Sequence, residues 1–293
     1  MLLLSVSLLF IFSILEVSIR LLTPPNRILD SDGKGVYTPD NNLTYRMKPN
    51  FKGSFPSYEF STEFSTNSEG FRGPEWNLSR HHKILILGDS FTAGHGVNYN
   101  ESFPAVLQKS LPSWSIIGLG VAGYSQKQEL PLLRKYSKIK PDIVILAYYI
   151  NDPAENCGII KRNITLTGYS QGEVTKGSES FVSRLSRTLG KVRTLSFLWQ
   201  RGRSLFEYLG LRSVNPGGLY SQNLMNNKGE DCYLLTQKLI SDMKSETEKI
   251  HSRFLVVIIP SKLELEPLSS SAREEYGFDP LIPIDRVLKI CSE

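Results

Sequence analysis

Four consecutive apolar residues, Ile84 to Leu87, run directly into Gly88-Asp89-Ser90. A short continuous apolar run of this kind predicts a strand that is buried on both faces of a parallel sheet. The turn that follows would present the hydroxyl of Ser90 at the carboxyl end of that strand. Ligands of open α/β sheets collect at this end, so Ser90 is a candidate nucleophile. The alternative is a serine that only occupies a turn or caps a helix.

Strands and helices are expected to alternate from Lys83 onward, which predicts an α/β fold with a flavodoxin-like, doubly wound parallel sheet. The expected strands are 83–88, 114–120, 142–149 and 254–259, and the expected helices are 101–110, 125–138, 231–251 and 283–293. Residues 153–230 are too many for a simple connection between two of these elements. We therefore interpret 153–230 as an insertion.

The amino-terminal residues divide into two further segments. Residues 1–22 are almost wholly apolar, although Glu16 and Arg20 interrupt the run. They predict a transmembrane or signal-anchor helix, with a cleaved signal peptide second and a buried first helix third. Residues 23–80 are predicted to be a linker to about residue 50, followed by a small β-rich segment. The α/β domain would then occupy 81–293 and lie outside the cytoplasm, in the periplasm or at the cell surface, or be secreted after cleavage.

The charge of the chain is mildly basic, with a net charge of +5 and a pI near 9.0. No basic run is interleaved with aromatic residues, so we expect no nucleic-acid partner. Residues 181–212 combine a cluster of basic residues with an apolar stripe. We favour a helix there that packs on the sheet with its basic face in water, over a lid or a lipid-binding helix.

The cysteines are an odd set without the close spacing of a metal site: Cys157, Cys232 and Cys291. One pair could be oxidised in an exported chain, but nothing in the sequence selects which, and unpaired structural cysteines are the favoured interpretation. No metal or cofactor is expected. A nucleotide-binding α/β domain is a weaker possibility, because neither glycine-rich phosphate motif follows the first expected strand.

Two more polar turns follow expected strands. Gly118 to Ser125 follows the second strand and contains Gly123, and Tyr149-Ile150-Asn151-Asp152 follows the third. Taken alone, the first is a plain βα turn and the second an Asx turn. Because parallel strands end at one edge, Ser90, Gly123 and Asn151 are expected to meet around one carbonyl group.

These three segments, in this order, resemble the conserved blocks of the SGNH (GDSL) hydrolases, a family of serine ester hydrolases and acyl transferases. The resemblance covers about residues 60–260. Within it, Asn67-Ser68-Glu69-Gly70-Phe71-Arg72 resembles a segment of a membrane-tethered branch. One departure is Tyr149, which stands where the family has glycine and is expected to reshape the pocket wall.

The resemblance implies a role for each matching residue. Ser90 would be the nucleophile, and the oxyanion hole would consist of the backbone N–H groups of Ser90 and Gly123 with the side-chain amide of Asn151. Asp89 and Asp152 would support these groups. The implied substrates are esters or O-acylated small molecules, lipids or glycans. The implied activity is that of an esterase, a lipase, or an O-acyl transferase or deacetylase, without a cofactor.

The base that would activate Ser90 is missing from the sequence. The family supplies it from an Asp-x-x-His segment after a fifth strand, and this sequence contains no such segment. His81, His82 and His251 are expected at the opposite edge of the sheet, roughly 15 Å away for the first two. His95 is nearer, but it would have to fold back onto its own connection.

We therefore expect a family fold that lacks its last strand and helix, through a premature stop, a frameshift or a split gene. Enzymes without one triad member retain only about 10³–10⁴-fold acceleration over water. The alternative function is thus a catalytically inactive remnant, or a protein that binds acyl groups or glycans without turnover.

Overall fold

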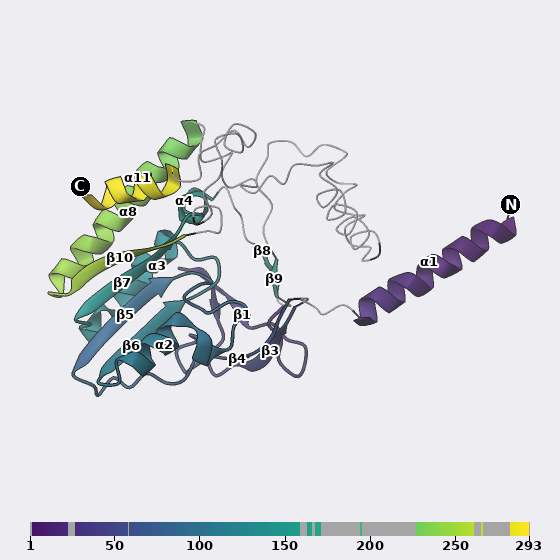
Figure 1. Cartoon of the computed structure of the whole chain (residues 1–293), viewed down its shortest axis with the longest axis horizontal. Coiled ribbons are helices and arrows are strands. Elements are labelled where there is room, and N and C mark those ends of the chain that lie inside the picture. Colours follow the sequence, from purple (N-terminus) through teal and green to yellow (C-terminus); the bar gives the residue numbers. More distant parts are fainter. Residues whose placement is uncertain are drawn as a thin grey trace. The chain divides into compact units, whose positions relative to one another are not determined.

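The computed structural model describes residues 2–22, 27–57, 59–158, 163–165, 168–170, 194, 227–260, 265 and 282–292 (Figure 1). By its internal contacts the chain divides into two units, residues 1–26 with 175–216, and residues 27–174 with 217–293. The first helix, α1 (Leu2–Leu22), belongs to the first unit, and every other helix and strand named below belongs to the second.

Helix α1 has large apolar side chains on its surface, and Phe10 and Leu21 are 65% and 79% exposed. Glu16, which interrupts the apolar sequence, accepts hydrogen bonds from the backbone N–H and the hydroxyl of Thr194 at 2.8 and 2.7 Å. Among the residues whose side chains the structure describes, no helix is both long and apolar enough to cross a membrane. The prediction of a helix at 1–22 is confirmed, and its assignment as a transmembrane span is not supported.

The second unit is built on a sheet of four parallel strands, as the alternation of strands and helices predicts. The strands are β5 (His82–Gly88), β6 (Trp114–Gly120), β7 (Ile143–Tyr149) and β10 (Arg253–Ile259), in the order β10–β7–β5–β6. Gly88 lies opposite both Gly120 and Ala147. The carboxyl ends of three adjacent strands therefore reach the same edge of the sheet.

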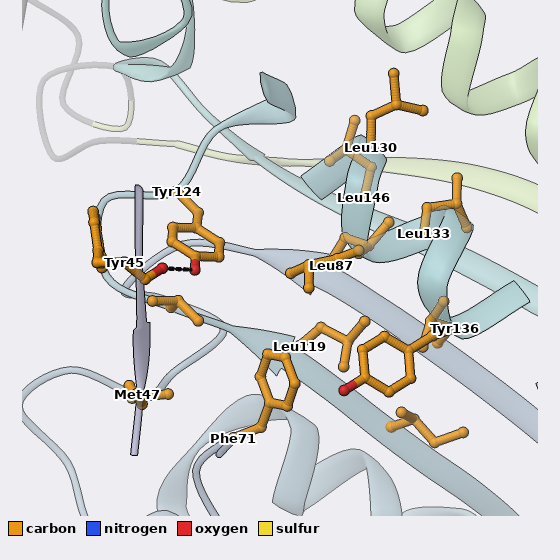
Figure 2. Packing of buried hydrophobic residues seen from close by; sticks show 14 of the residues in the cluster. Tyr45, Met47, Phe71, Leu87, Leu119, Tyr124, Leu130, Leu133, Tyr136 and Leu146 are labelled. Carbon is orange, nitrogen blue, oxygen red and sulfur yellow. Dashed lines mark hydrogen bonds between the residues drawn. The ribbon is translucent and has the colours of Figure 1, made fainter. Parts of the chain in front are cut away.

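Side chains of alternating direction give the sheet two apolar faces. Leu85 and Leu87 of β5 share one core with α3 (Gln126–Tyr136) and α8 (Asn227–Lys249), and Figure 2 shows Leu87 near Leu130 and Leu133 of α3. Ile84 and Ile86 point to the other face, which α2 (Phe103–Ser110) covers. Burying one such side chain contributes about 1.5–3 kcal/mol to folding, so this double burial accounts for the continuous apolar run.

The segment before the sheet forms two antiparallel hairpins, β1 (Tyr37–Asp40) with β2 (Thr44–Met47), and β3 (Lys52–Pro56) with β4 (Ser61–Ser65). The second hairpin lies in the stretch that the sequence predicts to be β-rich. Alternate residues of β2, Tyr45 and Met47, are buried in the same core as the sheet. The first hairpin lies inside the stretch expected to be a linker, and it forms because these alternate side chains are apolar.

The other α-helices and strands that the structure describes in the second unit follow β7 and β10. They are α4 (Asp152–Asn156), β8 (Asn163–Thr165), β9 (Gly168–Ser170) and α11 (Ile282–Ser292), in which Val287 is fully buried. The expected helices at 231–251 and 283–293 are thus observed as α8 and α11. The basic segment 181–212 lies outside the described residues, apart from Thr194.

Two of the three cysteines are paired, whereas the favoured interpretation of the sequence is three unpaired thiols. Cys157 and Cys232 form a disulfide, with Cα atoms 5.5 Å apart, and Cys291 is free and exposed. The bond joins the end of α4 to α8, two segments 75 residues apart in the sequence. Spacing could not select this pair, because only the packing of α4 on α8 brings the two residues together.

Candidate active site

Ser90, Gly123 and Asn151 lie in the loops that leave the carboxyl ends of β5, β6 and β7, respectively. These strands are adjacent and parallel. The three residues therefore lie at the carboxyl ends of adjacent strands, as the sequence predicts.

The turn that carries Ser90 is held by hydrogen bonds to Asp89, which is buried. Oδ1 of Asp89 accepts the N–H of Phe91 at 2.9 Å, and Oδ2 accepts the half-buried hydroxyl of Ser90 at 3.5 Å. The carbonyl of Ser90 accepts the N–H of His95 at 2.9 Å. The ring of Phe91 packs against Tyr149, with centroids 4.7 Å apart. Tyr149 thus contributes an aromatic wall where the resemblance leads one to expect glycine.

The loop of Gly123 is held to β2 by two reciprocal hydrogen bonds. The hydroxyl of Tyr45 donates to the carbonyl of Ala122 at 2.7 Å, and the hydroxyl of Tyr124 donates back to the carbonyl of Tyr45 (Figure 2). Gly123 lies between these two anchored residues with φ of +81°. Glycine suits this position, because residues with a Cβ rarely adopt a positive φ.

The side chain of Asn151 has a partner that the sequence did not reveal. Its Nδ2 donates to Oε1 of Glu155 at 3.0 Å, which leaves the second amide proton for a ligand. The next residue, Asp152, accepts hydrogen bonds at Oδ2 from Nε2 of Gln126 at 2.6 Å and from the N–H of Tyr149 at 3.3 Å. Asp152 thereby holds the beginning of α4, next to Asn151.

Four acidic residues gather behind these loops. Burial, followed by the charges of Asp152 and Asp89, raises the pKa of Glu155 well above its usual value. The pKa of Glu129 is raised for the same reasons, with a further contribution from Glu155. Glu155 is the residue at helical spacing i+4 from Asn151, which is the only sequence signal that could have indicated it. Among the described residues, no group of acidic, histidine and cysteine side chains could hold a metal ion.

A buried polar network extends from the acids toward α8. Oε1 of Gln126 accepts Nδ2 of Asn156 at 2.7 Å, and the same Nδ2 donates to Oγ1 of Thr236 at 2.9 Å. Thr236 is one turn beyond Cys232, and Asn156 is next to Cys157. The network and the disulfide together fasten α4, and with it the loop of Asn151, to α8.

Three of the four histidines lie at the edge of the sheet opposite Ser90. His82 begins β5, where its ring stacks on Trp114 at 4.8 Å and its Nδ1 is 3.3 Å from Oδ1 of Asp142. His81 precedes it, and His251 lies just before β10. These positions agree with the expectation that the strands separate the three imidazoles from Ser90.

His95, the fourth histidine, lies in an aromatic slot. The centroid of its ring is 5.0 Å from that of Phe55 and 5.5 Å from that of Phe60. Burial, followed by the charge of Arg72, lowers the pKa of His95. All four histidines are among the described residues, and within that part of the chain no imidazole forms a hydrogen bond with Oγ of Ser90.

An α/β sheet whose carboxyl edge carries a serine, a positive-φ glycine and an asparagine belongs to the class of α/β proteins with a site at the strand ends. Comparison with family models narrows the class, because the model for GDSL-like lipase/acylhydrolase matches residues 84–278. The chain belongs to this family of ester hydrolases. Comparison with curated proteins finds no match.

Solved structures give two further likenesses. The crystal structure of TesA is 13% identical and matches 67% of this chain and 76% of its own, with a TM-score of 0.34. The structure of AlinE4, an SGNH-hydrolase family esterase, is 17% identical and matches 66% of this chain and 93% of its own, with a TM-score of 0.23. At these TM-scores, neither likeness carries an argument about the site.

Proposed function

We propose that this chain cleaves or transfers the acyl group of an ester, with Ser90 as the nucleophile. The observation that carries the proposal is the position of Ser90, Gly123 and Asn151 at the ends of three adjacent parallel strands. The family supplies the reaction class, and the buried turn around Asp89 supports Ser90 as the reacting residue.

The proposed reaction begins when Oγ of Ser90 attacks the ester carbonyl carbon and loses its proton to a base. The oxygen of the tetrahedral intermediate would accept hydrogen bonds from the N–H groups of Ser90 and Gly123 and from Nδ2 of Asn151. Loss of one such donor typically costs about 3–4 kcal/mol of transition-state stabilisation. The intermediate then expels the alcohol, which takes up a proton, and water or an acceptor alcohol removes the acyl group from Ser90.

Asp89 is the acceptor that the structure gives to the hydroxyl of Ser90, at the long distance of 3.5 Å. A carboxylate is a weak base for a serine hydroxyl, and none of the histidines bonds to Oγ within the described residues. This observation favours a second candidate function, in which the chain binds an acyl group or an O-acylated glycan without turnover.

Hydrolysis of p-nitrophenyl esters of increasing acyl length separates the two functions. We expect hydrolysis by the wild-type chain that falls to background in Ser90→Ala and is unchanged in Ser110→Ala, an exposed serine on α2. Hydrolysis that survives Ser90→Ala would refute Ser90 as the nucleophile. Saturable ester binding without hydrolysis would support the second candidate.

We also propose that the chain acts outside the cytoplasm, on envelope lipids, O-acylated glycans or exported esters. The Cys157–Cys232 disulfide supports this location, because disulfides persist in oxidising compartments and are rare in the cytosol. Alkylation in freshly lysed cells tests it, and we expect one reactive thiol per chain. Three reactive thiols would contradict an oxidising compartment.

Membrane attachment through α1 is a separate proposal, which its exposed apolar side chains support. Extraction of membranes with alkaline carbonate tests it. We expect the chain to remain with the pellet and a variant without residues 2–22 to be released. Release of both would refute attachment by α1.

A further inference from the structure

The side chain of Arg72 is buried against backbone carbonyl groups. It is 7% exposed, and its Nη1 donates to the carbonyl of Ala93 at 3.0 Å and to that of Gly94. Its Nη2 donates to the carbonyl of Val97 at 2.7 Å and to that of Glu63, in β4, at 3.0 Å. One guanidinium group therefore joins a strand of the amino-terminal hairpins to the loop that follows Ser90.

No carboxylate among the described residues forms an ion pair with Arg72. The guanidinium instead lies over the ring of Phe64, 4.6 Å from its centroid, and burial lowers its pKa to about 10, which still leaves it charged at neutral pH. A buried charge is costly unless hydrogen bonds compensate it. Here the compensation comes from carbonyl oxygens, so the loop and the arginine stabilise each other.

The loop is shaped to receive this side chain. Gly94 and Gly96 have φ of +70° and +82°, and a Cβ on Gly94 would be 3.1 Å from Nη1 of Arg72. A loop with a positive φ at Gly94 and again at Gly96 cannot form a continuous helix. Several of its carbonyl groups are therefore left without helical partners. Arg72 has the right geometry to bind several of them at once, because a guanidinium group carries five N–H donors in a planar fork.

The same loop is bonded directly to the turn of Ser90. The N–H of Ala93 donates to the carbonyl of Asp89 at 3.0 Å, and the N–H of His95 donates to the carbonyl of Ser90 at 2.9 Å. Ala93 belongs to both sets of contacts, because its carbonyl accepts from Arg72 and its N–H donates to Asp89, and His95 follows Gly94, whose carbonyl Arg72 also binds. A shift of this loop would move Ser90 relative to Gly123 and Asn151.

We propose that Arg72 is a positioning residue, which fixes the direction of Ser90 by binding the 93–97 loop from the amino-terminal hairpins. The proposal rests on the proposed function of Ser90. It also gives a physical role to Arg72 within the Asn67–Arg72 segment.

The first test is the rate at which a fluorophosphonate labels Ser90, in the wild-type chain, Arg72→Met and Arg72→Lys. Misplacement by about 1 Å can cost about 100-fold in rate, so we expect Arg72→Met to label about 10- to 100-fold more slowly, although all of the folded protein is finally labelled. Arg72→Lys should be intermediate, because its ammonium has three donors and no fork. The slowing should lie in the rate constant of bond formation, with the affinity for the probe little changed.

Arg80→Met is the matched control. Arg80 also donates to a backbone carbonyl, that of Trp114, but at the opposite edge of the sheet. We expect its labelling rate to stay within about twofold of the wild-type rate, since Arg80 lies at the opposite end of the strands from Ser90 and shares no contact with it. Millimolar guanidinium should restore part of the rate of Arg72→Gly and leave that of Arg80→Met unchanged. Labelling of Arg72→Met at the wild-type rate would overturn the proposal.

Amide hydrogen exchange provides a readout that does not depend on activity. In Arg72→Met, the N–H groups of Ala93 and His95 should exchange faster than in the wild-type chain, while those within β5 should be unchanged. Equal exchange in the loop would overturn the positioning role, even in a chain that no probe labels. Absence of labelling in the wild-type chain, together with faster exchange in the variant, would support the role of Arg72 and refute only the reactivity of Ser90.

Discussion

Removal of the Cys157–Cys232 bond should destabilise the second unit strongly. The bond spans a sequence separation of 75 residues. For a closed loop of this length, the chain-entropy relation gives about 4.5 kcal/mol at 25 °C, and the usual range for disulfides is about 2–4 kcal/mol. We therefore expect the Cys157→Ser, Cys232→Ser double variant to lose about 2–4.5 kcal/mol in the free energy of unfolding. The effect reaches the site, because the bond fastens α4 next to the loop of Asn151.

Urea denaturation followed by circular dichroism measures this loss. Cys291→Ser is the control, because Cys291 is free and exposed and should change stability by less than about 0.5 kcal/mol. Reductant should destabilise the wild-type chain and the control, but not the double variant. A double variant as stable as the wild-type chain, or a wild-type chain with three free thiols by mass, would refute the reasoning.

Three further predictions concern the loops and the acids behind them. Asn151→Ala should lower ester turnover by about 10²–10³-fold, since it removes one oxyanion donor; equal turnover would exclude that role. Tyr45→Phe should cost about 0.5–1.5 kcal/mol in urea denaturation through loss of the hydrogen bond to Ala122, and no loss would contradict the anchoring of the Gly123 loop. Because the pKa of Glu129 is raised, the native state keeps a proton that the unfolded state releases above about pH 4.5. The free energy of unfolding should therefore fall as the pH rises from about 4.5 toward the raised pKa. Glu129→Gln should remove part of that fall, and an unchanged pH profile would exclude Glu129 as its source.

The strands of the sheet can be predicted from the sequence because a short run of neighbouring residues determines each of them. The apolar runs at Ile84–Leu87 and Ile143–Tyr149 are long enough to be buried on both faces, and each ends at a polar turn. The edge that carries Ser90 follows from the parallel order of the strands. These inferences need only neighbouring residues and the geometry of parallel strands.

Features that depend on contacts between distant residues could not be predicted in the same way. Arg72 stands in a turn-rich segment, and only the folded hairpins bring it to the carbonyls of Ala93 and Gly94. The alternation of Tyr45 and Met47 is too short to distinguish a buried strand from a linker. Glutamate on a helix is usually exposed to solvent, so the sequence does not indicate that Glu129 is buried. Its burial becomes evident only once α4 and β5 are packed beside it.

The most direct test of the account is the site at which a fluorophosphonate binds covalently, determined by mass spectrometry of peptides from the labelled 293-residue chain. The account predicts a single adduct on Ser90, which is lost in Ser90→Ala and retained in Ser110→Ala. An adduct on another residue, or no adduct on a chain whose fold is intact, would contradict Ser90 as the nucleophile.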